Sequence, residues 1–358
     1  MHRGTVSDVD PDGPFGGIDA DDGRLRRQMR AEPRQWLAQP AHAAPPAHAA
    51  RPGSNAVSGQ FQYDRLVLQY QQAGHGDPVL LIHGLGCSGA DWTLQIAALE
   101  RQFLVIVPDL PGCGGSSPPR NGYSIGGFAA ALWSLLDHLG TSGVNIVGFS
   151  LGGAVALEMA LQRAGHVPRL ALINTLASYQ DDWRKWTYAR KSAATIRLLG
   201  MRRAARLFAE ELFPQPWQAG LRARAAHVVG SVPAHRYLEI SDALERWTAS
   251  DRPDRIRSRT LLIAGEHDPA PLAEKRDLAA RLDARLVVVR GSRHGTPFDA
   301  SEATNASLLA HLTDRPLPSE DRLVCDSPER SHAIEAHSLG SSEQRGHFTQ
   351  QQVDIHGL

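Results

Sequence analysis

The chain has 358 residues, a length that fits one large α/β domain or two small ones, and its 38 basic and 38 acidic side chains balance. This balance excludes an overall field that would attract nucleic acid or a membrane surface. Three cysteines are too few for a disulfide framework, so we expect a reducing, cytoplasmic location. Because the N-terminus has no secretory pattern and no segment approaches the ~18 apolar residues of a membrane helix, we expect a soluble protein without a membrane span.

The two ends of the chain are poor in apolar residues. Residues 1–58 include the low-complexity run AQPAHAAPPAHAARPGS, which offers too little apolar surface to offset the entropy lost on ordering. Residues 315–358 are also polar and show no periodicity. We predict that both terminal segments are disordered and that the folded part lies between them.

Between these ends, short apolar runs alternate with helix-length amphipathic segments. The stretch FQYDRLVLQYQQAG comes first, and its alternating pattern predicts one or two strands of a starting hairpin. The later runs are apolar on both faces, which predicts a mostly parallel central sheet with helices on both sides. These runs are PVLLIH (78–83), FLVIVPD (103–109), VNIVGF (144–149), RLALINT (169–175), TLLIAGEHD (260–268) and RLVVVR (285–290). Five helices are expected near 90–100, 125–138, 151–163, 272–282 and 300–312.

An insertion at residues 181–255 breaks this alternation with helical patterns and no strand. Because it separates two strands of one sheet, we predict a helical cap over the carboxyl edge of the sheet, where α/β proteins bind ligands. The catalytic core then comprises residues 59–180 and 256–314. We expect Trp183 and Trp186, at the start of the cap, to face the substrate.

The insertion is also basic. Residues 181–259 contain 16 Arg or Lys and 9 Asp or Glu, an excess of seven positive charges. A basic cap would attract acidic substrates, but the composition favours a solvated helical face in an arginine-rich protein.

The sharpest motif is Gly148-Phe149-Ser150-Leu151-Gly152, which lies between the apolar run VNIVGF and the helical run LGGAVALEMALQ. A nucleophile elbow needs this context, because the chain turns sharply from strand to helix and small residues at 148 and 152 avoid clashes. The turn places Ser150 at a helix N-terminus, where free N–H groups favour developing negative charge. We predict that Ser150 is a nucleophile; the alternative is a glycine-rich turn that only packs well.

A serine nucleophile needs a base that a third group holds in place. With this elbow the expected chain order is serine, then Asp or Glu, then His. Asp268 ends a predicted strand and His294 follows the last one, so both are expected at the same sheet edge as Ser150. Glu266 remains an alternative acid, whereas His267 precedes the last strand and is expected in a solvated loop.

An oxyanion hole is expected beside the serine. One donor is the backbone N–H of Leu151, and the other is that of Leu85 in the loop HGLG at 83–86. Glycines allow a backbone to approach the substrate closely, so we expect Gly84, together with Phe149 of the elbow, to line the substrate site.

Five motifs occur in the order seen in α/β-hydrolases, namely HGLG (83–86), DLPGCGGS (109–116), GFSLGG (148–153), GEHD (265–268) and SRHGTP (292–297). Residues 60–313 therefore resemble a capped member of that superfamily. The resemblance implies that Asp109 has a structural role in a loop near the active-site mouth. The serine at 150 separates the chain from branches that use an aspartate there. The fold hosts esterases, lactonases, thioesterases, acyltransferases and C–C bond hydrolases.

We expect from these residues a hydrolase that cleaves carboxylic esters through an acyl-enzyme, with no metal or organic cofactor. One alternative is a lactonase or C–C bond hydrolase of an aromatic-degradation pathway. The other is a non-catalytic ligand-binding relative, which would not need the Ser, Asp and His together. The expected partner is a small ester or lactone and not nucleic acid, and the sequence does not set the oligomeric state.

Overall fold

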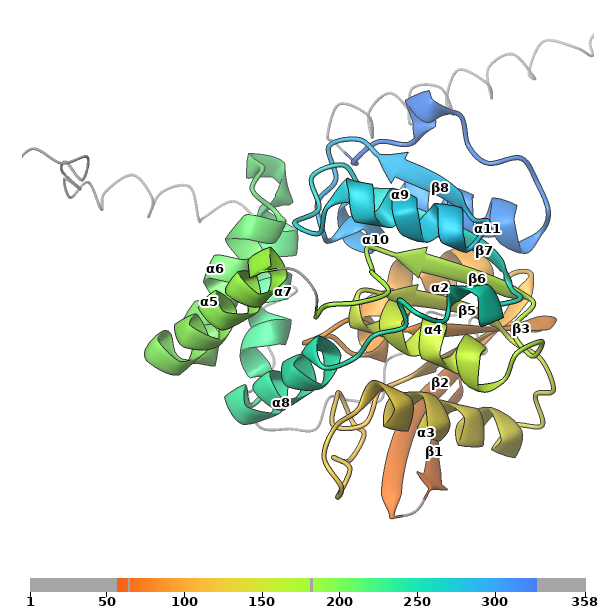
Figure 1. The fold of residues 1–358 in the computed structure, drawn as a ribbon, viewed down its shortest axis with the longest axis horizontal. Helices are drawn as coiled ribbons and strands as arrows, with labels where there is room; N and C mark the ends of the chain where they lie inside the picture. The colour runs from red at the N-terminus through yellow and green to blue at the C-terminus, as the bar shows by residue number, and fades with distance from the viewer. Residues whose placement is uncertain (1–56, 64, 181–182, 327–358) are drawn as a thin grey trace, which may run out of the picture. The chain divides into compact units, whose positions relative to one another are not determined.

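The structure is a computed structural model that describes residues 57–63, 65–180 and 183–326, without the side chains at 183–186 and 188. All of these residues belong to one compact unit, residues 49–358. An eight-stranded sheet forms its centre, in the strand order β1-β2-β4-β3-β5-β6-β7-β8 (Figure 1). The strands are β1 (Val57–Tyr63), β2 (Leu66–Ala73), β3 (Asp77–Ile82), β4 (Phe103–Pro108), β5 (Asn145–Phe149), β6 (Arg169–Ile173), β7 (Arg259–Gly265) and β8 (Arg285–Val289).

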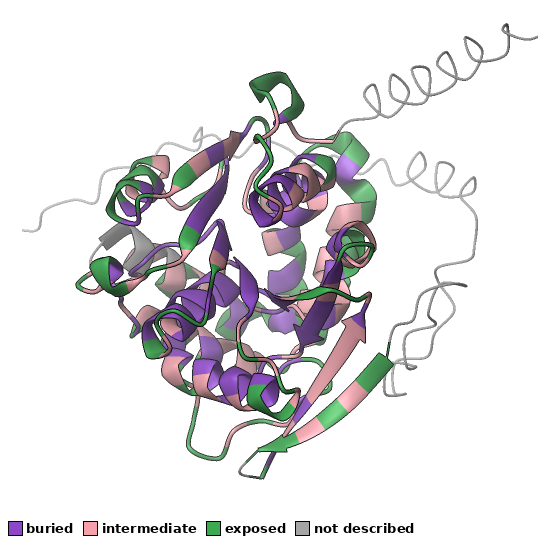
Figure 2. Ribbon diagram, turned by 90° about the vertical axis from the view of Figure 1, so that its right-hand side faces the viewer, coloured by how far each residue is buried: buried purple, intermediate pink, exposed green. Residues whose placement is uncertain are grey.

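The sheet is mostly parallel, as the sequence predicts. Strands β1 and β2 form the expected antiparallel hairpin, and β2 also pairs antiparallel with β4, whereas the pairs from β4 through β8 are parallel. Strand β5 is buried along its whole length, while β1 is largely exposed at one edge of the sheet (Figure 2). The carboxyl ends of β5, β6, β7 and β8 therefore meet at one edge.

Alternate residues of the central strands enter two cores, one on each face of the sheet. In β3, Leu80 and Ile82 pack with α3, α4 and α9, whereas Val79 and Leu81 pack with α2 and α11. Burial on both faces explains why these strands read as continuous apolar runs in the sequence. The helices are α2 (Thr93–Leu99), α3 (Ile125–His138), α4 (Leu151–Gln162), α9 (Leu272–Arg281), α10 (Thr296–Asp299) and α11 (Ser301–Leu312).

In the part of the predicted insertion that the structure describes, four α-helices lie between β6 and β7, grouped to one side of the sheet in Figure 1. They are α5 (Trp183–Leu199), α6 (Met201–Leu212), α7 (Ala219–Ser231) and α8 (Ala234–Glu245). Ile196, Met201 and Ala204 form a small apolar cluster within these helices, while α8 joins the main core through Ile240 and Leu244. Trp183 and Trp186 begin α5, but their side chains lie outside the described part of the chain. Across the described residues, none of the helices combines the length and apolar character that a bilayer crossing needs.

The C-terminal segment is ordered further than the sequence predicts, because residues 315–326 pack on the domain. Leu323 is buried in the core that contains α11, and its carbonyl accepts a hydrogen bond from the Arg290 N–H at 2.9 Å. Cys325 N–H donates to the Arg290 carbonyl at 2.9 Å, so this stretch extends the sheet edge beyond β8. The prediction of disorder from residue 315 is therefore wrong for residues 315–326. Their polar composition does not reveal that Leu317 and Leu323 pack on the core and that backbone hydrogen bonds to Arg290 and Asp299 hold this stretch.

Candidate active site

The turn between β5 and α4 holds Ser150 in a strained backbone conformation, with φ 54° and ψ −116°. A positive φ is costly for a residue with a Cβ, so the surroundings must enforce it. Gly148 and Gly152 make this possible, because a Cβ on Gly148 would overlap the Gly152 carbonyl and one on Gly152 would overlap the Ile82 carbonyl. The small residues predicted for the elbow are thus required by backbone contacts.

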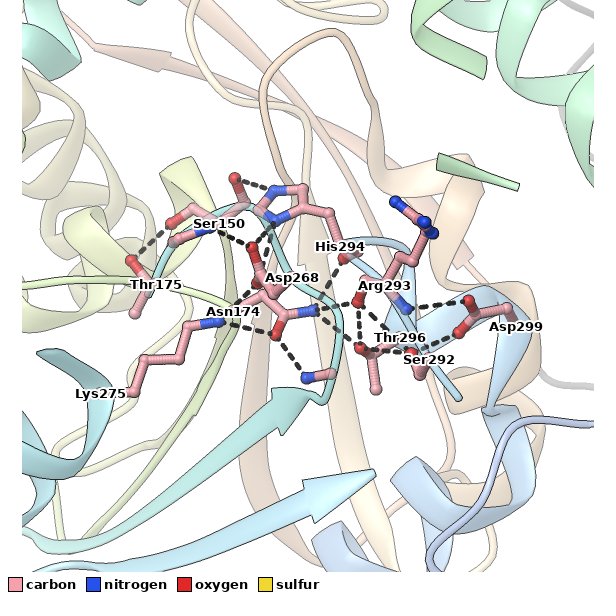
Figure 3. Close-up of polar contacts among 12 residues, drawn as sticks. Ser150, Asn174, Thr175, Asp268, Lys275, Ser292, Arg293, His294, Thr296 and Asp299 are labelled. Atoms are coloured by element: carbon pink, nitrogen blue, oxygen red, sulfur yellow. Dashed lines mark hydrogen bonds and ion pairs between the residues drawn. The ribbon is translucent and has the colours of Figure 1, made fainter. Parts of the chain in front are cut away.

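The structure brings together the three side chains that the sequence selects, and Figure 3 shows them in a row. His294 Nε2 lies 2.9 Å from Ser150 Oγ, and His294 Nδ1 lies 3.2 Å from each carboxylate oxygen of Asp268. With the Nδ1 tautomer protonated, the imidazole donates to Asp268 and accepts the Ser150 hydroxyl proton. The geometry is therefore suited to proton removal from the hydroxyl.

A lysine also contacts the Asp268 carboxylate. Lys275 Nζ of α9 lies 2.6 Å from Asp268 Oδ2, and the two side chains are only 2% and 1% exposed. Burial raises the pKa of Asp268, but the charges and hydrogen bonds of His294 and Lys275 outweigh burial and bring it to about 2. Burial lowers the pKa of Lys275, and the charge of Asp268 opposes that shift. The Asp268 carboxyl group is thus held in its ionised form.

The two residues that compete with Asp268 and His294 in the sequence point elsewhere. Glu266 Oε2 accepts the N–H of Gly291 at 2.9 Å, and its side chain is half exposed. His267 is also exposed, with Nε2 3.6 Å from the Glu266 carboxylate. Of the two acidic candidates, the structure places only Asp268 against His294.

Asn174 is a central residue of the site that the sequence analysis did not identify. It follows β6 with a positive φ of 48°, which asparagine tolerates better than most residues. Its amide nitrogen donates to the carbonyl of His294 at 2.8 Å and to Thr296 Oγ1 at 2.7 Å, while its oxygen accepts the Gly265 N–H at 2.9 Å. Asn174 therefore ties the end of β6 to the end of β7 and to the loop that carries His294. The only signal in the sequence was a polar residue directly after a buried strand.

The buried carboxyl group of Asp299 supports the loop that carries His294. Asp299 Oδ1 accepts the Ser292 hydroxyl at 2.7 Å, and Ser292 Oγ also lies 2.8 Å from Thr296 Oγ1 (Figure 3). Burial raises the pKa of Asp299 to about 6, although the bond from Ser292 opposes the shift. The loop around His294 is thus fixed by polar contacts on both sides.

The glycine-rich loop after β3 lies directly beside the elbow. A Cβ on Gly84 would lie 2.9 Å from the Phe149 ring, so these two predicted substrate-site residues are in contact. The Phe149 ring centre is 5.3 Å from that of His294. Leu85 follows Gly84 in this loop and Leu151 begins α4, so the two predicted oxyanion donors belong to the two segments that are in contact here.

The buried side chain of His83 and the partly buried side chain of Asp109 brace the loops around the site. His83 Nε2 accepts the Leu110 N–H at 3.0 Å, and its Nδ1 donates to the Gly84 carbonyl at 2.9 Å. Burial lowers the pKa of His83, which favours this neutral, bridging form. Asp109 accepts backbone N–H groups from Gly89 at 2.7 Å and from Gly115 at 2.8 Å. Both side chains act on loop backbones.

Side chains of the helical insertion lie against the loops of the site. Tyr237 of α8 and Val229 of α7 lie 3.1 and 3.3 Å from where a Cβ on Gly86 would be. Phe213, at the end of α6, lies 2.6 Å from the corresponding point on Gly295, next to His294. These three side chains flank both the loop of Leu85 and the loop of His294, and the sequence analysis did not select them.

Comparison with known proteins gives a family model and several relatives. The model described as alpha/beta hydrolase fold matches residues 77–301. A putative carbamate hydrolase from Stutzerimonas stutzeri is 31% identical over 265 residues, covering 69% of this chain and 97% of the relative. The crystal structure of the enol-lactonase from Burkholderia xenovorans superposes with a TM-score of 0.65 at 25% identity, covering 71% of this chain and all of that one. A shorter match, 43% identical over 105 residues, covers 29% of this chain but only 31% of an uncharacterized protein from Mycobacterium tuberculosis.

Proposed function

The chain belongs to the alpha/beta hydrolase fold family, as its five motifs predict, and we propose that it is a serine hydrolase that cleaves carboxylic esters. One observation supports this proposal above all. The imidazole of His294 bridges Ser150 Oγ at 2.9 Å and the Asp268 carboxylate at 3.2 Å, at the tip of a strained elbow. A non-catalytic binding protein would have no need for such an arrangement of base, acid and nucleophile.

The proposed reaction proceeds in two halves. His294 Nε2 takes the proton of Ser150 while Oγ attacks the ester carbonyl carbon. The resulting oxyanion accepts hydrogen bonds from the backbone N–H groups of Leu85 and Leu151. The C–O bond then breaks, and the imidazolium gives its proton to the leaving alcohol. The same imidazole then takes a proton from a water molecule, whose oxygen attacks the acyl carbon. As the bond from that carbon to Ser150 Oγ breaks, the imidazolium gives its proton to Oγ and the carboxylic acid leaves. Asp268 keeps the imidazole oriented and stabilises its charged form throughout.

We also propose that helices α5–α8 act as a cap that shapes the substrate site. The contacts of Tyr237 and Val229 with Gly86, and of Phe213 with Gly295, support this role. Specificity then resides in the side chains of these helices, whereas the reaction resides in the sheet edge. The contribution of Trp183 and Trp186 and that of the basic charge remain predictions.

A lactone is the second candidate substrate, because one structural relative is an enol-lactonase at 25% identity over its whole length. A lactone is a cyclic ester, so the same serine, base and oxyanion donors serve both reactions. The carbamate hydrolase relative points to a third acyl class with the same demands. A panel of open-chain esters, lactones and carbamates will rank these substrates.

The test is hydrolysis of a short p-nitrophenyl ester by the wild type and by Ser150→Ala. We expect turnover in the wild type and none above background in the variant, with Ser134→Ala of α3 as the matched control at full activity. Asp268→Asn is expected to lower kcat by about 10⁴-fold, because the imidazole takes the wrong tautomer. A fluorophosphonate probe should label Ser150 stoichiometrically. Unchanged turnover in Ser150→Ala would remove the nucleophile, and a folded wild type that neither turns over nor labels would favour a binding protein.

A further inference from the structure

Lys275 is a buried cation for which the proposed reaction has no use. It is one of three lysines in a chain whose 38 basic residues are otherwise arginines. Its side chain is 2% exposed inside α9, facing the Asp268 carboxylate. Lysine is almost never buried to this degree unless it is paired, because removing an ammonium group from water is costly. The burial of Lys275 therefore calls for a functional explanation.

The contacts of the Asp268 carboxylate show how Lys275 acts on the site. Oδ1 accepts the backbone N–H of Ala270 at 2.9 Å, and both oxygens share the imidazole Nδ1 of His294 at 3.2 Å. The contact of Oδ2 with Lys275 Nζ is the shortest of the set, at 2.6 Å. The acid thus contacts both the imidazole of His294 and the ammonium group of Lys275.

The remaining polar groups around this pair do not replace Lys275. Asn174 Oδ1 lies 3.5 Å from Nζ and is uncharged. Tyr179, whose hydroxyl lies 3.2 Å from Thr175 Oγ1, is neutral, because burial raises its pKa to about 12 and the Asp268 charge adds to the shift. Glu274, the neighbour of Lys275 on α9, is acidic and adds no positive charge. Lys275 is therefore the permanent counter-ion of the acid.

We propose that Lys275 is a positioning residue that fixes the Asp268 carboxylate and reduces the proton affinity of His294, so that hydrolysis extends to lower pH. The proposal rests on the function proposed above. A lone carboxylate favours protonation of a neighbouring imidazole, whereas a carboxylate already neutralised by an ammonium group favours it much less. With Lys275 in place, the imidazole remains an unprotonated base at a pH where it would otherwise carry a proton.

The direction of the effect follows from the sign of the charge. Only the neutral imidazole can accept the Ser150 proton, so activity falls on the acidic side as His294 becomes protonated. Removal of the Lys275 charge makes protonation of the His294 imidazole more favourable, so the acidic limb of the activity profile moves to higher pH. Because the Lys275 charge acts on the imidazole through the Asp268 carboxylate that both groups contact, we expect its removal to shift this midpoint by about one pH unit. A lysine that only filled space would leave the midpoint unchanged.

The test compares the pH profile of kcat/KM for the wild type and for variants at position 275. Lys275→Met removes the charge at similar volume, and Lys275→Gln also removes it but keeps a donor for Asp268. We expect both to move the acidic limb upward by about one pH unit. Lys275→Arg should restore the wild-type midpoint. Arg276→Met, which removes an exposed positive charge from the same helix, serves as the matched control and should not move it.

A second measurement separates this proposal from the proposed function. In the Ser150→Ala background, NMR can follow the pH at which the His294 imidazole is half protonated, with and without Lys275→Gln. An upward shift on removal of the charge is expected whether or not an ester is hydrolysed. Absence of turnover with this shift would overturn the esterase but keep the role of Lys275. Equal midpoints in wild type, Met and Gln variants, with only a change in plateau rate or stability, would overturn the role of Lys275.

Discussion

The carboxyl edge of the sheet and the helical insertion beside it are held by different kinds of interaction. At the edge, close backbone packing around the two glycines of the elbow holds Ser150. Buried hydrogen bonds hold Asn174, and a buried ion pair holds Asp268. In the insertion, α7 has no buried residue among its thirteen, and Leu198 of α5 is 82% exposed. The insertion joins the core through a few contacts, of which the bond from Trp247 Nε1 to Glu158 Oε2 at 3.0 Å is one.

This contrast separates reactivity from selectivity. Displacements at the edge are costly, because the buried side chains of Asn174 and Asp268 are each bonded to groups on other elements. The helices have more freedom, since most of their surface faces solvent and their own apolar cluster is small. We therefore expect substitutions at the edge to abolish activity and substitutions in the helices to change which substrates are accepted.

The largest expected difference between the sheet edge and the insertion comes from replacing one glycine in each region with alanine. Gly152→Ala forces a Cβ into the Ile82 carbonyl, so we expect a loss of about 3 kcal/mol of unfolding free energy and of at least about 100-fold in kcat/KM. Gly220→Ala in α7 meets nothing within 4 Å and is expected to stabilise by about 0.5 kcal/mol. Urea denaturation and ester turnover measure both. Similar effects of the two substitutions would remove the contrast between the regions.

A pH-dependent effect of intermediate size is expected from Asp299, below the His294 loop. Its pKa, raised by burial to about 6, exceeds the unfolded value of 3.8, so the native state binds the proton more tightly. Its contribution to the free energy of unfolding, about 3 kcal/mol, is fully present below pH 4 and is lost as the pH rises through 6. Asp299→Asn should remove this loss, seen as a difference between urea denaturation curves at pH 4 and pH 7.

The control for this measurement must account for a group of opposite sign. Burial lowers the pKa of His311 to about 4, so its contribution to stability grows as the pH rises from 4 toward 6.5. The difference between wild type and variant cancels this part. Asp277→Asn, on the exposed face of α9, should leave the difference at zero. A pH dependence that survives Asp299→Asn would contradict the assignment.

The smallest effect is expected where the insertion meets the core. Trp247→Phe removes the donor to Glu158 and should cost about 1 kcal/mol of unfolding free energy, with turnover of a short ester unchanged. Trp217→Phe, at a half-exposed position, is the control and should cost nothing measurable. A single unfolding transition in both variants is expected if the insertion folds with the core. Two separate transitions would show that the helices unfold on their own.

The sequence predicted those features that depend on order along the chain. Strand runs apolar on both faces indicated the parallel sheet, and the order of Ser150, Asp268 and His294 indicated which side chains meet. Lys275 could not be predicted, because within LAEKRDLAAR it is one charged residue among several, and only the orientation of α9 shows that it is buried. Asn174 escaped prediction for a similar reason, since its bonds reach loops about 90 and 120 residues further along the chain.

The backbone of Ser150 also limits which nucleophile this elbow can carry. At φ 54° a side chain with two heavy atoms on its Cβ is strained against its own main chain, so threonine is strongly disfavoured although it has the required hydroxyl. Cysteine has a single atom there and fits the same torsion angles, with a more nucleophilic sulfur. Replacing Ser150 with cysteine would therefore change the acyl-enzyme from an oxygen ester to a thioester without a change of backbone. Replacing it with threonine, a secondary alcohol, is opposed by the backbone conformation itself.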